Sequence, residues 1–229
     1  MSEAPDGGRE LAPLRGGRHG LSREQVTQSQ RERLLAAAVQ VVARDGYQAS
    51  TVHEIARTAS VSSRDFYENF SGKEECFLSA FDIVVEHTRA LLTEAAEPEP
   101  DWAHETIAGM RAAMRFASAE QDLTHVCLIA ALTASPAILV RRSEALLEMV
   151  PFLRRGREQR GGAEPLPEST EESVIGGLVV LVARSIGTGR SLEAVFPDLV
   201  DFVLSPYLGP ERASELAEEV RQKGVLKKR

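Results

Sequence analysis

The sequence predicts an all-α protein in which a small N-terminal domain precedes a larger helical domain. Three observations support this prediction. Apolar residues recur every three or four positions along most of the 229 residues, as they do on the buried face of a helix. Hydroxyl residues followed three positions later by an acid or amide, the capping-box pattern of helix starts, recur in the first third of the chain. No long stretch alternates between apolar and polar residues, so we expect essentially no sheet.

Composition narrows the class of protein. Hydrophobic residues make up 43% of the chain, enough for one substantial core or for a small domain joined to a larger one. The net charge of −7 provides no global positive field, so any nucleic-acid binding must be local. Cys76 and Cys127 fit neither a disulfide framework nor a thiolate zinc site. Residues 1–20 lack the apolar core of a signal peptide, and the apolar run at 176–183 is too short to span a bilayer. We therefore expect a cytoplasmic protein that does not enter a membrane.

The N-terminal segment divides into an arm and a helix. Residues 1–21 are rich in Gly, Pro and charge, which predicts a disordered arm. Six arginines against three acids between positions 9 and 33 could contact phosphate or could only solubilise the arm. A helix is expected from Ser22, capped with Gln25, to Asp45, with Gly46 ending it. Its buried stripe consists of Leu34, Leu35, Ala38, Val41 and Val42.

Three further capping boxes follow within about two dozen residues, at Thr51–Glu54, Ser62–Asp65 and Ser71–Glu74. They predict helices over 51–58, 62–70 and 72–95. The first two, joined by the tight turn 59–61, have the lengths of a helix-turn-helix, so we assign residues 22–75 to such a domain. The third helix would connect this domain to the rest of the chain. Burial of Phe66 and Phe70 against Ile55, Ala56 and Val61 would leave Ser63, Arg64, Tyr67 and Glu68 on the opposite face.

That opposite face has the chemistry of a DNA-reading helix. Arginine and serine at a helix N-terminus can reach base edges in a major groove. Thr51, Tyr67 and Lys73 would then supply hydroxyl and ammonium contacts to phosphates on either side. Short capped helix pairs also occur in purely structural bundles and in protein contacts, so the pattern alone leaves both interpretations open.

The same stretch resembles the TetR family of bacterial transcription regulators. The resemblance lies in a helix ending in Gly-aromatic, a Thr-capped helix with Ile-Ala, a Val-Ser turn, Tyr-x-x-Phe and a Lys-Glu start, in "DGYQASTVHEIARTASVSSRDFYENFSGKEECF". The spacing holds over about residues 31–81. The resemblance implies phosphate contacts from Thr51, Ser62, Tyr67 and Lys73, and places Ser63, Arg64 and Asn69 at or near the bases.

Two departures from the family pattern affect what can be transferred. Ser60 stands where the family usually has Gly in the turn, and Arg64-Asp65 replaces the usual Gly-Thr ahead of the aromatic pair. Arg64 adds a guanidinium whose parallel N–H donors suit guanine, whereas Asp65 and Glu68 add negative charge beside DNA. We interpret Asp65 as a cap partner within its helix rather than as a base reader. The operator sequence therefore cannot be copied from relatives.

The Pro/Glu-rich stretch at 95–101 marks the start of the second domain, 96–229. Its expected helices cover 101–119, 121–133, a segment from Pro136 that kinks or stops at Pro151, 169–187, 191–206 and 210–222. A polar loop is expected over 154–170. We find no catalytic motif, no metal-ligand spacing among the five histidines and no cofactor-binding loop, so we expect neither an enzyme nor a metalloprotein.

The second domain instead predicts an apolar helical interior. Most of its inward-facing residues are expected to pack in an ordinary hydrophobic core. Methionine and aromatic side chains with a few polar groups also suit an adaptable cavity for a small apolar or amphipathic ligand. The TetR resemblance also implies a ligand-binding domain here. The candidate ligand contacts are Met110, Met114, Phe116, His125, Met149 and Phe152.

The stretch "SVIGGLVVLVARSIGTG" is apolar on nearly every side of the expected helix. One face would then pack on the core of its own chain, and the other would need to be covered by a partner. With the amphipathic helix after it, it could form a four-helix interface between two copies of the chain, which is also the family's arrangement. A buried helix in a larger monomer is the alternative. The candidate interface residues are Ile175, Leu178, Val179, Val182, Ile186, Phe196, Leu199 and Val203.

These expectations combine into a hypothesis of function. A homodimer would bind double-stranded DNA at a palindromic operator, and a small-molecule inducer would shift the connecting helix and release a repressor from the DNA. A ligand-independent DNA-binding regulator is one alternative. A helical enzyme is a second alternative, from a different class of protein.

Overall fold

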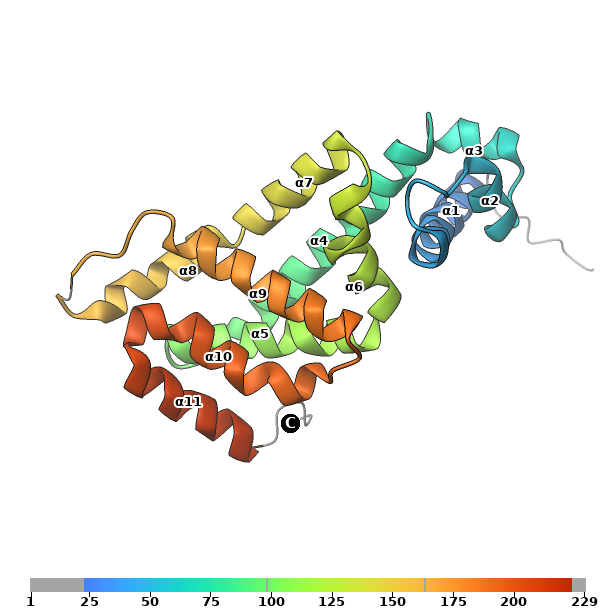
Figure 1. The fold of residues 1–229 in the computed structure, drawn as a ribbon. Coiled ribbons are helices and arrows are strands. Elements are labelled where there is room, and N and C mark those ends of the chain that lie inside the picture. Colours follow the sequence, from blue (N-terminus) through green and yellow to red (C-terminus); the bar gives the residue numbers. More distant parts are fainter. Residues whose placement is uncertain (1–22, 98, 163, 224–229) are drawn as a thin grey trace, which may run out of the picture.

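The computed structural model describes residues 23–97, 99–162 and 164–223, and within them every regular element is a helix, as predicted. The predicted disordered arm and Ser22 lie outside these residues. Figure 1 shows the order of the helices. Their bounds are α1 (Arg23–Asp45), α2 (Val52–Thr58), α3 (Ser63–Asn69), α4 (Lys73–Ala96), α5 (Trp102–Ala119), α6 (Gln121–Leu128), the 3₁₀ helix η1 (Ala130–Thr133), α7 (Pro136–Leu147), α8 (Val150–Arg154), the 3₁₀ helix η2 (Arg155–Arg160), α9 (Thr170–Gly187), α10 (Leu192–Leu208) and α11 (Pro210–Lys223).

Three expected elements differ from those observed. The helix expected over 121–133 is split into α6 and η1. The expected interruption near Pro151 lies just before it, because α7 ends at Leu147 and Pro151 sits in the first turn of α8, where no backbone donor is needed. The expected loop 154–170 begins with the helix η2.

Two of the three closely spaced caps are confirmed. The hydroxyls of Thr51 and Ser62 each accept a hydrogen bond from a backbone amide three residues later, both at 3.1 Å. The third box is wrong, because Gly72 holds the N-cap position of α4. The carboxylate of Glu75 accepts from both the amide and the hydroxyl of Ser71 at 2.7 Å, so an acid one position further on satisfies the helix start.

The first four helices enclose a core of their own. The predicted stripe of α1 is buried, and Phe66 and Phe70 pack on Ile55 and Ala56, with Val61 partly buried beside them. Since α2 and α3 are each only 7 residues long, this packing rather than intrinsic helix stability holds them in place.

A second cluster joins these helices to the rest of the molecule. Val42 and Phe77, from α1 and α4, are buried against Val126 of α6, Ala131 of η1 and Ile138 of α7. α4 continues from this cluster into the larger helical region (Figure 1). The helix-turn-helix unit, residues 23–81, is therefore fixed to the larger region through α4 and through the α6–η1 segment.

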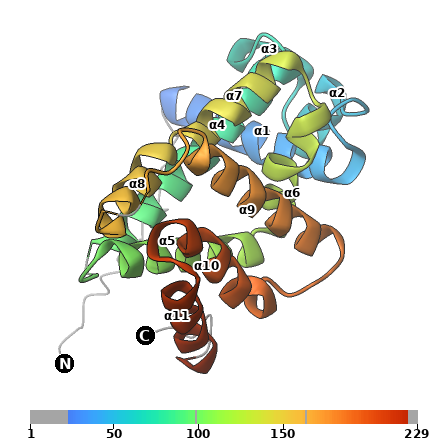
Figure 2. The same cartoon turned by 60° about the vertical axis from the view of Figure 1, so that its left-hand side comes forward.

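The largest core lies among α5, α9, α10 and α11. In both ribbon views α9 and α10 lie side by side, and α11 packs against α10 (Figures 1 and 2). Tyr207 and Trp102 stack edge to face at the centre of this core, with ring centroids 5.0 Å apart.

Most of the residues predicted for a dimer interface belong to this core. Ile175, Val182, Phe196, Leu199 and Val203 are buried within one chain, so they do not lie on a surface that this chain leaves open to a second copy. Both helices are apolar on more than one face, and the sequence did not reveal which face the chain covers itself. The remaining three, Leu178, Val179 and Ile186, are half-buried.

The turn between α2 and α3 is strained at Ser60, the residue that stands where the family usually has Gly. Ser60 has φ of 54°, the left-handed region that favours glycine, and it is the only described non-glycine residue with a positive φ. The guanidinium of Arg33 donates to the carbonyl oxygens of Ala59 and Ser60 at 3.1 and 3.4 Å. These bonds from α1 hold the turn despite the strain.

We predict that Ser60→Gly raises the free energy of unfolding by about 0.5–1 kcal/mol, because glycine removes the Cβ clash of the left-handed conformation. Chemical denaturation monitored by circular dichroism measures this. Ser60→Ala, which keeps the Cβ, is the matched control and should not stabilise. A loss of stability in the glycine variant would show that the turn is not strained.

Candidate nucleic-acid interface and apolar cavity

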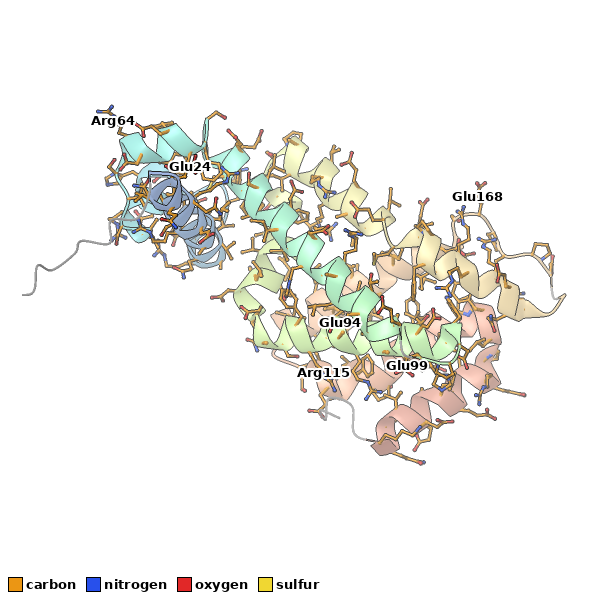
Figure 3. The ribbon with its side chains drawn as sticks, turned by 180° about the vertical axis from the view of Figure 1, so that it is seen from behind. Glu24, Arg64, Glu94, Glu99, Arg115 and Glu168 are labelled. Carbon is orange, nitrogen blue, oxygen red and sulfur yellow. The ribbon has the colours of Figure 1, made fainter. Side chains whose placement is uncertain are left out.

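The exposed face of α3 carries the side chains expected to read DNA. Ser63, Arg64 and Tyr67 are exposed, and the Tyr67 side chain is 60% accessible while Phe66 beside it is fully buried. Arg64 lies at the outer tip of the molecule, away from the larger helical region (Figure 3). Its Nε donates to the carboxylate of Glu68 at 3.3 Å, an exposed pair one helical turn apart. Such a pair is weak in water, so the guanidinium can exchange it for a base edge.

Two other predicted contact residues have structural partners. The Asn69 amide donates to the backbone oxygen of Asp65 at 2.8 Å, which turns it onto its own helix. The Lys73 ammonium donates to the carbonyls of Tyr47 and Ser50 at 2.9 and 3.0 Å and lies 4.4 Å from the centroid of the Tyr47 ring. Lys73 thus fastens the segment before α2 to the start of α4.

The structure adds two arginines that the sequence interpretation missed. Arg31 donates to the backbone oxygen of Asn69 at 3.2 Å and to the hydroxyl of Ser79, and its guanidinium lies 4.3 Å from the centroid of the Phe70 ring. It therefore neutralises the carbonyl end of α3, while Arg33 holds the preceding turn. These two members of the arginine-rich segment point inward to backbone oxygens, so they orient α3.

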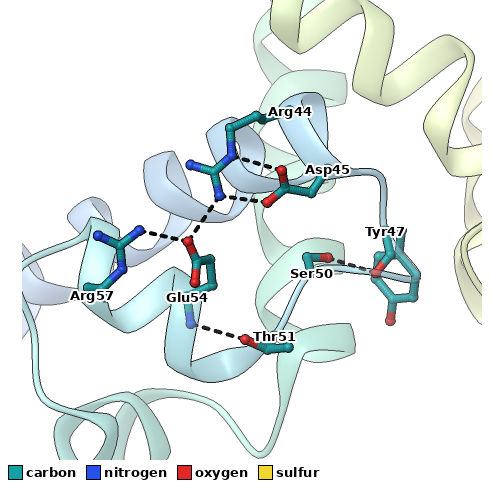
Figure 4. A network of polar contacts seen from close by, with 7 residues as sticks. All are labelled: Arg44, Asp45, Tyr47, Ser50, Thr51, Glu54 and Arg57. Carbon is teal, nitrogen blue, oxygen red and sulfur yellow. Dashed lines mark hydrogen bonds and ion pairs between the residues drawn. The ribbon is translucent and has the colours of Figure 1, made fainter.

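An ion-pair network joins the end of α1 to α2 (Figure 4). Arg44 contacts Asp45 and Glu54 at 2.6 and 3.1 Å, and Arg57 contacts Glu54 at 2.7 Å. Hydrogen bonding and charge from Arg57, followed by those from Arg44, hold the pKa of the Glu54 carboxyl below its usual value. The positive charges near Thr51 are thus balanced by carboxylates. Local side chains, rather than a broad positive patch, must provide any DNA contact.

The larger helical region encloses an apolar cavity of about 360 Å³, within the range of small-molecule sites. Five of the six residues predicted to contact a ligand line it: Met110, Met114, Phe116, Met149 and Phe152. His125 does not; it is half-buried on α6 outside the lining. Five residues assigned to a dimer interface line the cavity as well: Ile175, Leu178, Val179, Val182 and Val203.

The helices that line this cavity also support the helix-turn-helix unit. α4 contributes Val84, Thr88 and Leu92 to the lining, and α6 contributes Thr124, Cys127 and Leu128. The threonine hydroxyls at 106 and 124 donate to backbone oxygens of their own helices, so they offer little polar chemistry. What the cavity can do is enclose an apolar group.

A buried ion pair fixes the wall of the cavity formed by α8. Arg157 of η2 contacts the fully buried carboxylate of Glu171 at 2.8 Å through two nitrogens and donates to the carbonyls of Leu166 and Pro167. The indole of Trp102 donates to the backbone oxygen of Phe152 at 3.1 Å. The guanidinium of Arg157 holds the pKa of the Glu171 carboxyl below its usual value.

We predict that this ion pair makes stability depend on pH. Because the pKa of Glu171 is lower in the folded state than the ordinary 4.5, its contribution is fully present above that value and is lost as pH falls through the folded-state pKa. The free energy of unfolding should therefore fall more steeply in acid for wild type than for Glu171→Gln. The adjacent, exposed Glu172→Gln is the control and should match wild type. Equal slopes in all three proteins would contradict the prediction.

α2 and α3, held on α1 with the outer face of α3 exposed, form a helix-turn-helix unit. Residues 34–80 match the family model for bacterial regulatory proteins of the tetR family. These residues therefore match the N-terminal domain of that family, as the sequence resemblance predicted.

Solved structures share this fold at low sequence identity. The fatty acid degradation regulator FadR of Bacillus halodurans is 19% identical, with a TM-score of 0.68 over 76% of this chain and 97% of that one. FadR of Bacillus subtilis in complex with stearoyl-CoA gives the same values. A TetR family regulator of Marinobacter aquaeolei VT8 is 20% identical, with a TM-score of 0.62 over 86% of this chain and 97% of that one. No curated protein sequence matches the chain.

None of the helices in the described part of the chain is both long and apolar enough to cross a membrane. In the same residues, no group of three or more histidine, cysteine or acidic side chains is placed to hold a metal ion.

Proposed function

We propose that the protein is a homodimeric repressor that leaves a palindromic operator when a small apolar or amphipathic molecule occupies the cavity. One observation carries this proposal: α4 and α6 line the cavity and also pack in the core that holds the helix-turn-helix unit. A ligand that changes the shape of the cavity therefore acts on the two helices that position α3. Such a ligand needs to favour the released shape by only a few kcal/mol.

The DNA contacts follow from exposure on α3. Ser63, Arg64 and Tyr67 are free of the core, so they can reach bases and phosphates, and Thr51 and Ser62 lie at exposed helix starts. Asn69 and Lys73 need to leave or share their backbone partners to contact DNA. We therefore assign them a smaller part in binding than Arg64 and Tyr67.

The ligand class is supported by the apolar lining. Aliphatic, aromatic and methionine side chains dominate the cavity, which suits an acyl chain or a similar apolar group. FadR of Bacillus subtilis, which shares the fold, was crystallised with stearoyl-CoA. A DNA-binding regulator without a ligand would have no need of this cavity.

The outer faces of α9 and α10 are the surface we propose for the dimer. Val180 is 64% exposed and Phe202 is 38% exposed, although both belong to otherwise apolar helices. Gly177 lets the Phe202 ring lie against α9, because a Cβ at position 177 would be 2.6 Å from that ring. This surface replaces the buried residues of the sequence prediction.

The operator can be found by selecting bound fragments from the genomic DNA of the host. The proposal expects a near-palindromic sequence whose half-sites are separated by about one or more turns of DNA. Recovery of no preferred fragment, with protein that is folded and dimeric, would contradict it.

We predict that two substitutions on α3 separate affinity from specificity. Tyr67→Ala should weaken binding to all DNA sequences, because it removes a contact to a phosphate of the DNA. Arg64→Ala should cost about 1–3 kcal/mol at one base pair and relax the preference there. Competitive electrophoretic shift assays with a substituted operator library measure both effects. His53→Ala, an exposed change on α2, is the control, and unchanged binding by both variants would show that α3 does not read the DNA.

A further inference from the structure

Two exposed charges of α9 have no partner in the described part of their own chain. Glu172 lies in the first turn of the helix and Arg184 in its last turn. Both are exposed, and neither forms an ion pair or a side-chain hydrogen bond with another described residue. At a rise of about 1.5 Å per residue they lie about 18 Å apart along the helix axis. Within one chain they therefore cannot pair with each other.

A glycine and an exposed apolar side chain lie between these charges on the same face of α9. Glu172, Gly176, Val180 and Arg184 follow one another at intervals of four residues and form one row, which we call the outer ridge. Val180 is 64% exposed. A Cβ at position 176 would meet no described atom within 4 Å, so packing within this chain does not require a glycine there. Glycine inside a helix is destabilising relative to alanine, and a close approach by another chain would explain it.

The order of residues in the outer ridge is complementary to itself when one copy is reversed. If a second α9 lies antiparallel to the first, with a twofold axis at the level of Leu178, Glu172 of each chain faces the partner's Arg184. Val180 of each chain then faces the partner's Gly176. In a parallel arrangement the like charges would face each other instead, which is unfavourable. The row therefore fits a second copy of the same chain in one direction only.

We infer that two copies of the chain pack α9 against α9 in this antiparallel register, centred at the level of Leu178. The inference rests on the proposed homodimer and names the residues that set its arrangement. Glycine at position 176 lets the two helix axes approach to about 8 Å, and each Val180 fills the space above the partner's glycine. Phe202, which lies against α9 at Gly177 and is 38% exposed, extends the apolar surface on the α10 side of the ridge.

The opposite face of α9 lines the apolar cavity, through Ile175, Leu178 and Val179 among others. α9 crosses the front of the larger helical region in Figure 1. At these positions a single helix separates the cavity from the proposed partner. A ligand that moves this wall of the cavity would therefore act on the contact between the two copies as well as on α4 and α6.

Cross-linking of the full chain tests the register. The double variant Glu172→Cys/Arg184→Cys carries two thiols too far apart to be joined within one chain. A short bismaleimide should convert it into covalent dimers, because position 172 of each chain faces position 184 of the other, whereas either single variant should stay uncoupled. Burial raises the pKa of both native thiols, Cys76 and Cys127, to about 12, so they should react slowly. Covalent dimers of a single variant would indicate another register and overturn the inference.

Charge reversal, followed by sedimentation of the full chain, provides a second test. Glu172→Arg and Arg184→Glu each turn both ion pairs of the dimer into like-charge contacts, so each should raise the dissociation constant of the dimer at least about ten-fold. The double reversal should restore it to within about three-fold of wild type. Neutralising Glu172 alone should change little, since a solvated pair adds little affinity. Glu94→Arg, an exposed reversal on α4 (Figure 3), is the control and should dimerise as wild type does.

A bulky residue at position 176 tests the close approach. Gly176→Leu should keep its helical circular dichroism, because its own chain leaves space there, yet it should weaken the dimer at least about ten-fold. Ala90→Leu, which adds the same side chain at an exposed position of α4, should leave the dimer unchanged. Loss of helix content in Gly176→Leu would contradict the open space at this position and the inference with it.

Sedimentation of wild type separates failure of this inference from failure of the proposed homodimer. A dimer that neither charge reversal nor Gly176→Leu weakens would overturn the register and leave the homodimer in place through another face. A protein that stays monomeric at every concentration would overturn both.

Discussion

The link between the helix-turn-helix unit and the cavity depends on α4 being one uninterrupted helix. Its first turns, with Phe77 and Phe81, are buried among the helices that carry α3, whereas Val84 and Leu92 line the cavity. A helix of 24 residues spans about 36 Å and behaves as a stiff rod over that distance. α4 therefore links the cavity to the unit that carries α3, and under the proposed function a displacement of the cavity wall would displace α3. The α6–η1 segment adds a second, shorter connection between the same regions.

Several basic side chains of the helix-turn-helix unit bind the protein backbone. The chain is acidic overall, and several of its basic side chains near α3, Arg31, Arg33 and Lys73, are bound to backbone oxygens. Their charge orients the short helices α2 and α3, which would be unstable alone. Arg64 and Tyr67 remain exposed, so sequence recognition is left to a small number of side chains on a rigid support.

Local signals in the sequence predicted most of the helices and the family, because caps, glycine ends and apolar periodicity act over a few residues. They predicted the starts at Thr51 and Ser62 but not the partner of Ser71, because Glu74 and Glu75 are both plausible partners in sequence and only the N-cap geometry selects one. Which apolar face meets the chain itself depends on packing between distant helices, so the sequence could not show that most of the residues expected at a dimer interface are buried within one chain.

The most direct test of the coupling is the distance between the two α2 helices of a dimer, measured by pulsed electron resonance on His53→Cys carrying a spin label. Burial raises the pKa of both native thiols, Cys76 and Cys127, to about 12, so the introduced cysteine should be labelled selectively. A molecule that raises the melting temperature of the protein should shift the distance distribution by several ångströms. An unchanged distribution in protein saturated with that molecule would contradict the account.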